Sequence, residues 1–211
     1  MADLGNIAES LIAGKIDDVK NQTQEAVDAG EKPEQIMQQG LLAGMGVVGE
    51  RFRDGDMFIP EVLRCAKAMH ASMDVLRPLL SQAEVESGGV FVIGTVEGDL
   101  HDIGKNLVAM MFEGAGFKVV NLGIDLEPSV FVDAVKEHNP DILAMSALLT
   151  TTMPKMGETI NALKEAGIRD QTKIMIGGAP VTQEFSDEIG ADGYAANAGS
   201  SVDKAKEILA K

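Results

Sequence analysis

The sequence has few of the residues from which several common kinds of site are built. Its 211 residues include no Trp, one Tyr, one Cys and three His. A single Cys excludes an intramolecular disulfide framework and argues against a Cys-rich zinc or iron–sulfur site, and it suits a reducing cytosol. Three His provide no multi-His metal cage. Because aromatic residues are scarce, the core must be built from aliphatic side chains and from the 12 Met.

Positive charge is also scarce. Lys and Arg total 18 against 33 Asp and Glu, which gives a formal net charge of −15. Such a surface repels a phosphate backbone, so we expect no nucleic-acid partner. No apolar run approaches the roughly 18 residues of a membrane span, and the opening sequence MADLGNIAES lacks the basic segment of a signal peptide. We therefore expect a cytoplasmic protein with no membrane partner.

In about the first 80 residues, apolar side chains recur at the spacing of amphipathic helices. Gly14 and Gly30 fall where helix C-caps are expected, and Pro33 and Pro60 fall near first turns. Four helices with short connections predict an antiparallel four-helix bundle, which we assign to a domain of residues 1–85. The four apolar stripes are Leu4, Ile7 and Leu11; Ile16, Val19 and Val27; Met37, Leu41, Met45, Val48 and Phe52; and Val62, Met69, Met73, Leu76 and Leu80.

Residues 81–89 are polar and end in Gly, as is typical of a linker, and strands then alternate with helices. This alternation predicts a five-stranded parallel sheet with helices on both faces, a flavodoxin-like (Rossmann-type) α/β domain of residues 90–211. Ligands of such sheets bind at the carboxyl ends of the strands. The expected strands are residues 90–95, 118–122, 142–146, 173–176 and 193–196, and the expected helices are about 103–116, 128–138, 154–166, 182–189 and from 202 onward.

The turn after the first predicted strand excludes two common nucleotide sites. Its sequence, GTVEGDLHDIGKN at residues 94–106, contains neither G-x-G-x-x-G nor G-x-x-x-x-G-K-[ST]. A phospho-receiver domain would need an Asp at the end of the third strand and a Lys at the end of the fifth. Ser146 and Ala196 lie in or near those places, which argues against a receiver as well.

One His in this turn has a carboxylate close by. His101 follows Asp99 by two residues, and a metal-binding imidazole is usually oriented by a carboxylate on its other nitrogen. Ser146, at the end of the third strand, can lie beside this turn and donate its hydroxyl to Asp99. A single protein ligand suffices only where a macrocycle completes the coordination. The alternative of a structural or solvated His101 stays open here, while His70 and His138 are interpreted as ordinary helix residues.

These residues form part of a longer spaced pattern. D-x-H-x-x-G appears as residues 99–104, S-x-L as residues 146–148 and G-G as Gly177 and Gly178. The pattern resembles that of the corrinoid proteins of methylamine, methanol and betaine methyltransferase systems, and of the cobalamin-binding region of methionine synthase. The segment VVGERFRDGDMFIPE, residues 47–61, resembles the helical cap of this family. The resemblance covers nearly the whole chain, with the first thirty residues matching only in general pattern.

The resemblance implies a cobalamin or related corrinoid bound base-off, with His101 as the lower axial ligand of cobalt. Asp99 and Ser146 would form a relay that tunes this ligand, because a proton on the His–Asp pair weakens imidazole donation and favours four-coordinate Co(I). Phe52 and Ile59 match apolar cap residues, although they can equally be core side chains. By the same resemblance, the cofactor and its buried nucleotide tail would contact Gly98, Asp99, Leu100, His101, Asp102, Ile103, Gly104, Ser146, Leu148, Thr150, Gly177, Gly178, Ala179, Tyr194, Asn197 and Ala198, some of which can also be ordinary loop and strand-end residues.

The implied function is that of a methyl carrier. A substrate-specific methyltransferase would place a methyl group on Co(I), and a second methyltransferase would pass it from methyl-Co(III) to tetrahydrofolate or a thiol. A reductive activation protein is a further expected partner. Methylamines, betaines, methanol and methoxylated aromatics are the class of donors. Because the two domains are used by the cap and the corrinoid site, we expect a carrier subunit rather than a complete enzyme.

Two other functions use the same kind of cofactor. A cobalamin-sensing regulator would normally need a DNA-reading module, against which the charge of −15 argues. The small subunit of an adenosylcobalamin-dependent mutase shares the His motif, but the helical cap before it favours methyl transfer. The relative affinities for methylcobalamin and adenosylcobalamin would distinguish these possibilities.

Overall fold

A computed structural model gives the fold and describes residues 3–80 and 88–210. The chain divides into two compact units. The helical unit contains the described residues up to Gly88 together with residues 113–117, and the α/β unit contains residues 89–112 and the described residues from 118 onward. Most of the predicted linker, residues 81–87, lies outside the described residues. In the described ranges, no helix combines the length and apolar character needed to cross a membrane.

In its described residues, the helical unit contains the four predicted helices. The third of them is one unbroken run from residue 33 to residue 54 whose middle is a π-helix. Gly40 and Gly44 lie in this run and allow it to approach α1 closely, since a Cβ on Gly40 would lie 3.1 Å from Ile7 and one on Gly44 would lie 3.2 Å from the backbone of Ala8. The bounds are α1 Leu4–Ile12, α2 Ile16–Asp28, α3 Pro33–Gln35, η1 Ile36–Leu42, α4 Ala43–Asp54, α5 Ile59–Leu76 and η2 Arg77–Leu79.

The core of this unit is aliphatic and rich in Met, as the lack of aromatic residues predicts. Leu11, Val19 and Leu41 are fully buried, and each comes from a different predicted stripe. Met37 and Met45, on the long third helix, are also buried. Burial of apolar surface of this kind is the main driving force for folding, at about 25 cal/mol per Å².

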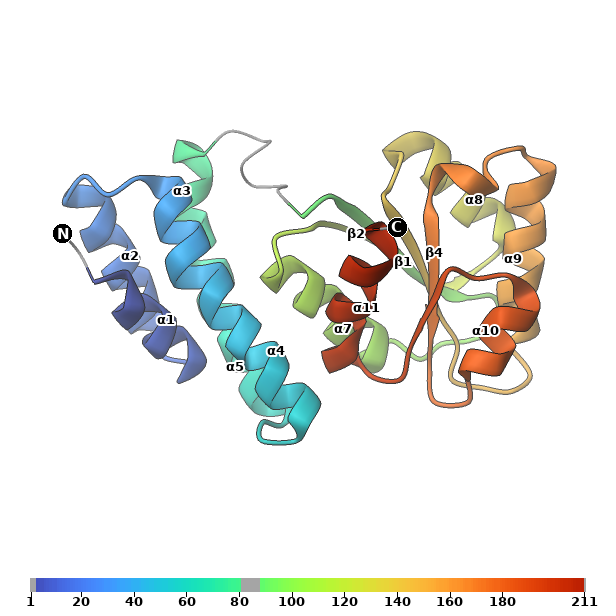
Figure 1. Ribbon diagram of the computed structural model, residues 1–211, viewed down its shortest axis with the longest axis horizontal. Coiled ribbons are helices and arrows are strands. Elements are labelled where there is room, and N and C mark those ends of the chain that lie inside the picture. Colours follow the sequence, from blue (N-terminus) through green and yellow to red (C-terminus); the bar gives the residue numbers. More distant parts are fainter. Residues whose placement is uncertain (1–2, 81–87, 211) are drawn as a thin grey trace. The chain divides into compact units, whose positions relative to one another are not determined.

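The α/β unit is a five-stranded, all-parallel sheet in the order β2-β1-β3-β4-β5. Figure 1 shows α7 and α11 on one side of the strands and α8, α9 and α10 on the other. The predicted flavodoxin-like architecture is therefore confirmed. The strands are β1 Val90–Val96, β2 Lys118–Leu126, β3 Ile142–Ser146, β4 Lys173–Gly177 and β5 Gly193–Ala195; the helices are α7 Ile103–Gly114, α8 Pro128–His138, α9 Pro154–Glu165, η3 Arg169–Gln171, α10 Gln183–Ile189 and α11 Ala198–Leu209.

Two predicted boundaries are wrong by four residues. Strand β2 continues to Leu126 because it resumes its pairing with β1 after an irregularity, at which Gly123 pairs with Gly94. Helix α11 begins at Ala198 rather than near residue 202 because the side chain of Asn197 caps it, accepting a hydrogen bond of 2.9 Å from the N–H of Ser200.

The strand order places one set of loops at a single edge of the sheet. β1 is flanked by β2 and β3, and the direction of the chain across the sheet reverses at this point. Thr95 of β1 pairs with Ser146 of β3, which pairs with Gly177 of β4. The loops that follow these three strands therefore meet at the switch point, where parallel sheets bind their ligands.

Candidate functional site

The loop after β1 carries one buried acid and one exposed imidazole. The chain turns at Gly98, whose φ of 79° lies in the left-handed region that favours glycine. Asp99 is fully buried, whereas the side chain of His101 is 52% exposed. The hydroxyl of Thr95 donates to the carbonyl oxygen of His101 over 3.0 Å and ties the loop to the end of β1. The loop after β1 thus buries the carboxylate of Asp99 and leaves the imidazole of His101 partly exposed to solvent.

Asp99 fixes the orientation of His101 through two contacts. The imidazole Nδ1 lies 2.7 Å from Oδ1 of Asp99, and the backbone N–H of His101 donates to the same oxygen over 3.1 Å. A carboxylate at this distance assigns the proton to Nδ1, because the ionised acid can only accept. The other ring nitrogen, Nε2, is then an available lone-pair donor, which is the state that a metal-ligating imidazole needs.

A second pair of donors holds the other oxygen of Asp99. The backbone N–H of Leu148 donates to Oδ2 over 2.7 Å, and the hydroxyl of Thr152 donates to it over 2.8 Å. The expected hydroxyl of Ser146 is not the one that the structure places on Asp99. Ser146 is the last residue of β3 and pairs with Thr95 of β1. The loop after β3 places the hydroxyl of Thr152 within hydrogen-bonding distance of the Asp99 carboxylate. The hydroxyl donor to Asp99 in this segment is therefore Thr152, six residues after Ser146.

These contacts keep Asp99 ionised. Burial by itself raises the pKa of a carboxyl group, because it disfavours the charged form. The hydrogen bonds that Asp99 accepts from the Leu148 N–H, from His101 and from Thr152 outweigh burial and hold its pKa well below its usual range. Asp99 is therefore a fixed negative charge next to Nδ1 at neutral pH.

The surroundings of His101 include exposed apolar side chains. Leu100 is 67% exposed and lies in the loop of residues 97–102, here called the ligand loop. Ile103, the first residue of α7, is 73% exposed. Leu148 and Leu149, which follow β3, are each 41% exposed. Exposed large apolar side chains are candidates for contact with a ligand where they lie next to one another.

Three of the four predicted glycines differ in how closely the protein surrounds them, while a Cβ on the fourth, Gly98, would make an ordinary contact of 3.5 Å with Thr152. Gly178 has a φ of 134°, and a Cβ there would overlap the carbonyl oxygen of Ala147, so the backbone itself requires glycine at this position. At Gly177 a Cβ would lie 3.3 Å from the carbonyl oxygen of Ala195. In contrast, a Cβ on Gly104 would meet no protein atom within 4 Å. No contact with the rest of the protein therefore requires glycine at position 104, which is exposed in the first turn of α7.

The other predicted site residues are more scattered. Asp102 accepts a hydrogen bond from Asn106, Thr150 and Ala179 are exposed, and Tyr194 is half-buried on β5. Asn197 caps α11 and Ala198 begins it. In the helical unit, Phe52 is half-buried on α4 and Ile59 is 42% exposed at the start of α5.

Sequence reasoning missed Thr152 and two further polar residues near the ligand loop. Asp125, at the end of β2, accepts a hydrogen bond from Gly98 over 2.7 Å. Lys105 is buried and donates to Asn121 over 2.6 Å. The run of three Thr after Leu149 was a usable indication of Thr152, because hydroxyls that follow a strand end at the switch point can reach a neighbouring loop.

Comparisons with known proteins identify a family. A family model described as a B12 binding domain matches residues 89–203, and a second model with the same description matches residues 4–77. Trimethylamine corrinoid protein 1 of Methanosarcina acetivorans is 49% identical over 188 residues, which cover 88% of this chain and 87% of that protein. A corrinoid protein of Desulfitobacterium hafniense is 44% identical and covers 100% of this chain and 99% of its own length.

Solved structures give the same result. A cobalamin-binding protein from Desulfitobacterium hafniense superposes with a TM-score of 0.81 at 35% identity, covering 99% of each chain. The methanol:cobalamin methyltransferase complex of Methanosarcina barkeri contains a chain that superposes with a TM-score of 0.87 at 33% identity, covering 97% of this chain and 78% of that one. The sequence pattern around His101, the flavodoxin-like sheet and these relatives together show that the chain belongs to the B12-binding corrinoid proteins of methyltransferase systems.

Proposed function

We propose that this chain is a methyl carrier that holds its corrinoid base-off, with the imidazole of His101 as the lower ligand of cobalt. The observation that supports this most directly is the 2.7 Å contact between Nδ1 of His101 and buried Asp99, which leaves Nε2 as the potential metal ligand on a side chain that is 52% exposed. Relatives named trimethylamine and dimethylamine corrinoid proteins support the carrier function.

The residues present fit such a cofactor. An oriented, exposed imidazole is a suitable axial ligand, and a Cβ on Gly104 would meet no atom within 4 Å from outside its own stretch of helix. When bound, the corrinoid supplies a cobalt centre that takes up and gives up a methyl group. His101 would donate its Nε2 lone pair, and Asp99 would hold the Nδ1 proton and so raise the basicity of the ring. Thr152 would keep the carboxylate in place.

The remaining parts of the proposal concern the two faces of the cofactor. Leu100, Ile103 and Leu148, all exposed near His101, would be covered by the bound group and exclude water from the ligand. Phe52 and Ile59 of the helical unit would protect the face that carries the methyl group. A cap of this kind must open, because a donor and an acceptor enzyme both need access to that face.

The proposed partners are three proteins. One methyltransferase delivers the methyl group from a small donor, a second removes it to tetrahydrofolate or a thiol, and a reductive activation protein restores the cofactor after oxidation. The complex of a methanol methyltransferase with a similar chain supports the first of these partners.

The visible spectrum of protein reconstituted with hydroxocobalamin tests the axial ligand. We expect a base-off, imidazole-ligated spectrum from the wild-type protein and loss of the imidazole ligand in His101→Ala. His138→Ala, which changes an imidazole at the end of α8, is the matched control and should keep the wild-type spectrum. An unchanged spectrum in His101→Ala would show that the proposed ligand is wrong.

A transfer assay tests the acceptor. Protein loaded with isotopically labelled methyl groups should give the label to tetrahydrofolate or to a thiol only when the second methyltransferase is added. Failure of both acceptors, with candidate enzymes that are active on a known corrinoid protein, would contradict this part of the proposal.

A further inference from the structure

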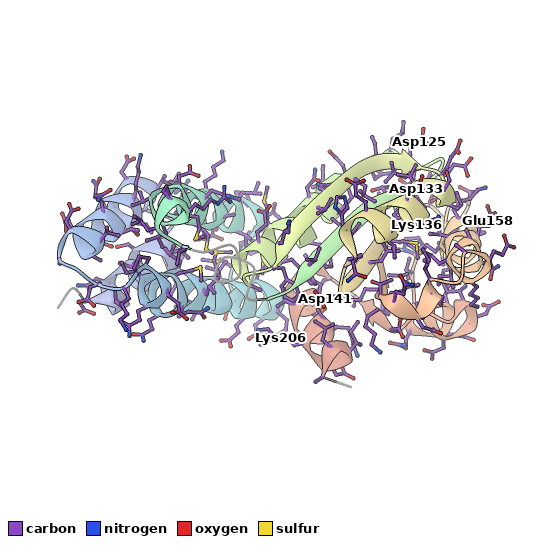
Figure 2. The ribbon with its side chains drawn as sticks, turned by 90° about the horizontal axis from the view of Figure 1, so that it is seen from above. Asp125, Asp133, Lys136, Asp141, Glu158 and Lys206 are labelled. Carbon is purple, nitrogen blue, oxygen red and sulfur yellow. The ribbon has the colours of Figure 1, made fainter. Side chains whose placement is uncertain are left out.

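Asp125 has an unusual backbone conformation at the switch point. Among the described residues, Asp125 and Asn139 are the two non-glycine residues with a positive φ, at 55° and 43°. Asn139 is the C-cap of α8, where this conformation is common. Asp125 instead lies at the carboxyl end of a strand, β2, as Figure 2 shows. Strained conformations persist where the surroundings hold them, and they concentrate at functional sites.

Asp125 is held there by two hydrogen bonds to the loop after β1. Its carboxylate Oδ1 accepts from the N–H of Gly98 over 2.7 Å. Its own N–H donates to the carbonyl oxygen of Asp99 over 3.1 Å. The two hydrogen bonds are made to successive residues of the loop after β1. They therefore fix both the N–H of Gly98 and the carbonyl group of Asp99.

The residue type matters because glycine would adopt this φ without strain. A glycine at position 125 would keep the N–H that donates to Asp99, but it would have no acceptor for the N–H of Gly98. The presence of Asp in a disfavoured conformation is therefore explained by its side chain. That side chain contacts the residue just before Asp99, whose carboxylate orients His101 over 2.7 Å.

We infer that Asp125 is a positioning residue for the cobalt ligand, an inference that rests on the proposed function. It acts on His101 through the backbone of Gly98 and Asp99, which its two hydrogen bonds hold. By fixing this backbone, Asp125 holds the Asp99 carboxylate where it can accept from Nδ1, and it thereby limits the directions in which His101 can present Nε2. β2 thus takes part in the site although none of its residues belongs to the signature pattern.

Two substitutions separate the side chain from the backbone. Asp125→Gly keeps the backbone N–H and tolerates the positive φ, but it removes the acceptor. Asp125→Asn keeps an acceptor oxygen of the same reach and tolerates the same φ. Asn139→Gly is the matched control, because it changes the other positive-φ residue at a helix end.

The first measurement uses the apoprotein. We expect amide hydrogen exchange at Gly98 to accelerate by about tenfold or more in Asp125→Gly, because the amide loses its acceptor. Asp125→Asn and Asn139→Gly should exchange as the wild type does. Equal exchange at Gly98 in Asp125→Gly and wild type would overturn the inference.

The second measurement uses protein reconstituted with hydroxocobalamin. Asp125→Gly should show a smaller imidazole-ligated fraction in its visible spectrum, and Asp125→Asn should restore it. Faster exchange at Gly98 with an undiminished imidazole-ligated fraction would overturn the positioning role. Absence of imidazole ligation in the wild type would overturn the proposed function instead, and the exchange comparison would still decide whether Asp125 holds the loop.

Discussion

At the scale of single residues, the site is a buried carboxylate with all of its acceptor directions in use. Asp99 accepts from His101 on one oxygen and from Leu148 and Thr152 on the other. A buried charge is tolerated only with such partners, since an unpaired one would be protonated or would destabilise the fold. The same contacts that make Asp99 compatible with burial also orient His101, so stability and ligand geometry depend on one set of hydrogen bonds.

Thr152→Val should therefore destabilise the apoprotein by about 1.5–3 kcal/mol, the usual contribution of a hydrogen bond to a charged group. The substitution keeps the shape of the side chain and removes the donor to Asp99. Thr152→Ser keeps the donor and should lose much less. Chemical denaturation followed by circular dichroism measures both. If Ser146→Ala costs more stability than Thr152→Val, then Thr152 is not the main hydroxyl partner of Asp99.

Lys105 provides a pH prediction. Burial lowers the pKa of this lysine from its ordinary value of 10.5, and the charge of Asp102 opposes the shift only in part. On raising the pH, the folded protein loses this proton before the unfolded chain does. The free energy of unfolding must then increase with pH in the interval below 10.5. Denaturation at a series of pH values should show this increase relative to Lys105→Met, and a parallel pH dependence in the two proteins would contradict it.

At the scale of elements, patterns local in sequence predicted most of the fold. The strands of the sheet interior are short apolar runs, such as Val90–Val96 and Ile142–Ser146, which are fully recognisable because both faces are buried. The end of β2 was missed because Gly123 interrupts the apolar pattern while the backbone still pairs with β1. Thr152 was missed because its contact with Asp99 spans 53 residues and depends on how the loop after β3 folds back.

Two glycines at the ends of elements should respond to substitution in opposite ways. Gly178 directly follows β4. The substitution Gly178→Ala should destabilise the apoprotein by about 2–4 kcal/mol, because the new Cβ would overlap the Ala147 carbonyl oxygen and the residue has a positive φ. Gly104→Ala, in the first turn of α7, should leave stability unchanged or raise it by up to about 1 kcal/mol.

The affinity for cobalamin completes this comparison. Gly104→Ala should bind hydroxocobalamin more weakly, because its methyl group enters the space that no protein atom occupies. Thermal unfolding of the apoprotein and titration with hydroxocobalamin provide the two measurements. Unchanged affinity in Gly104→Ala would show that the space beside α7 is not used by the cofactor.

At the scale of the whole molecule, the two units carry different parts of the proposed chemistry. The α/β unit contains His101 and its described hydrogen-bonding partners Thr95 and Asp99, and it carries the whole D-x-H-x-x-G, S-x-L and G-G pattern. The helical unit carries exposed apolar residues, among them Phe58 at 68% and Ile59 at 42% exposure. Their exposure could not be predicted from spacing, because apolar residues at helical spacing are more often part of a core.

A role of the helical unit in protecting the cofactor can be tested at Ile59. Ile59→Ser changes a side chain that is already 42% exposed, so the free energy of unfolding should change by less than about 0.5 kcal/mol. If Ile59 helps to exclude water and oxidants from the methyl-bearing face, the reduced cobalt should be oxidised faster in the variant. Stopped-flow spectroscopy of the reduced, loaded protein measures this rate.

Leu79→Ser is the matched control, since Leu79 is 51% exposed in the same unit but lies outside the segment that resembles the cap. Equal oxidation rates in Ile59→Ser, Leu79→Ser and wild type would mean that Ile59 does not shield the cofactor.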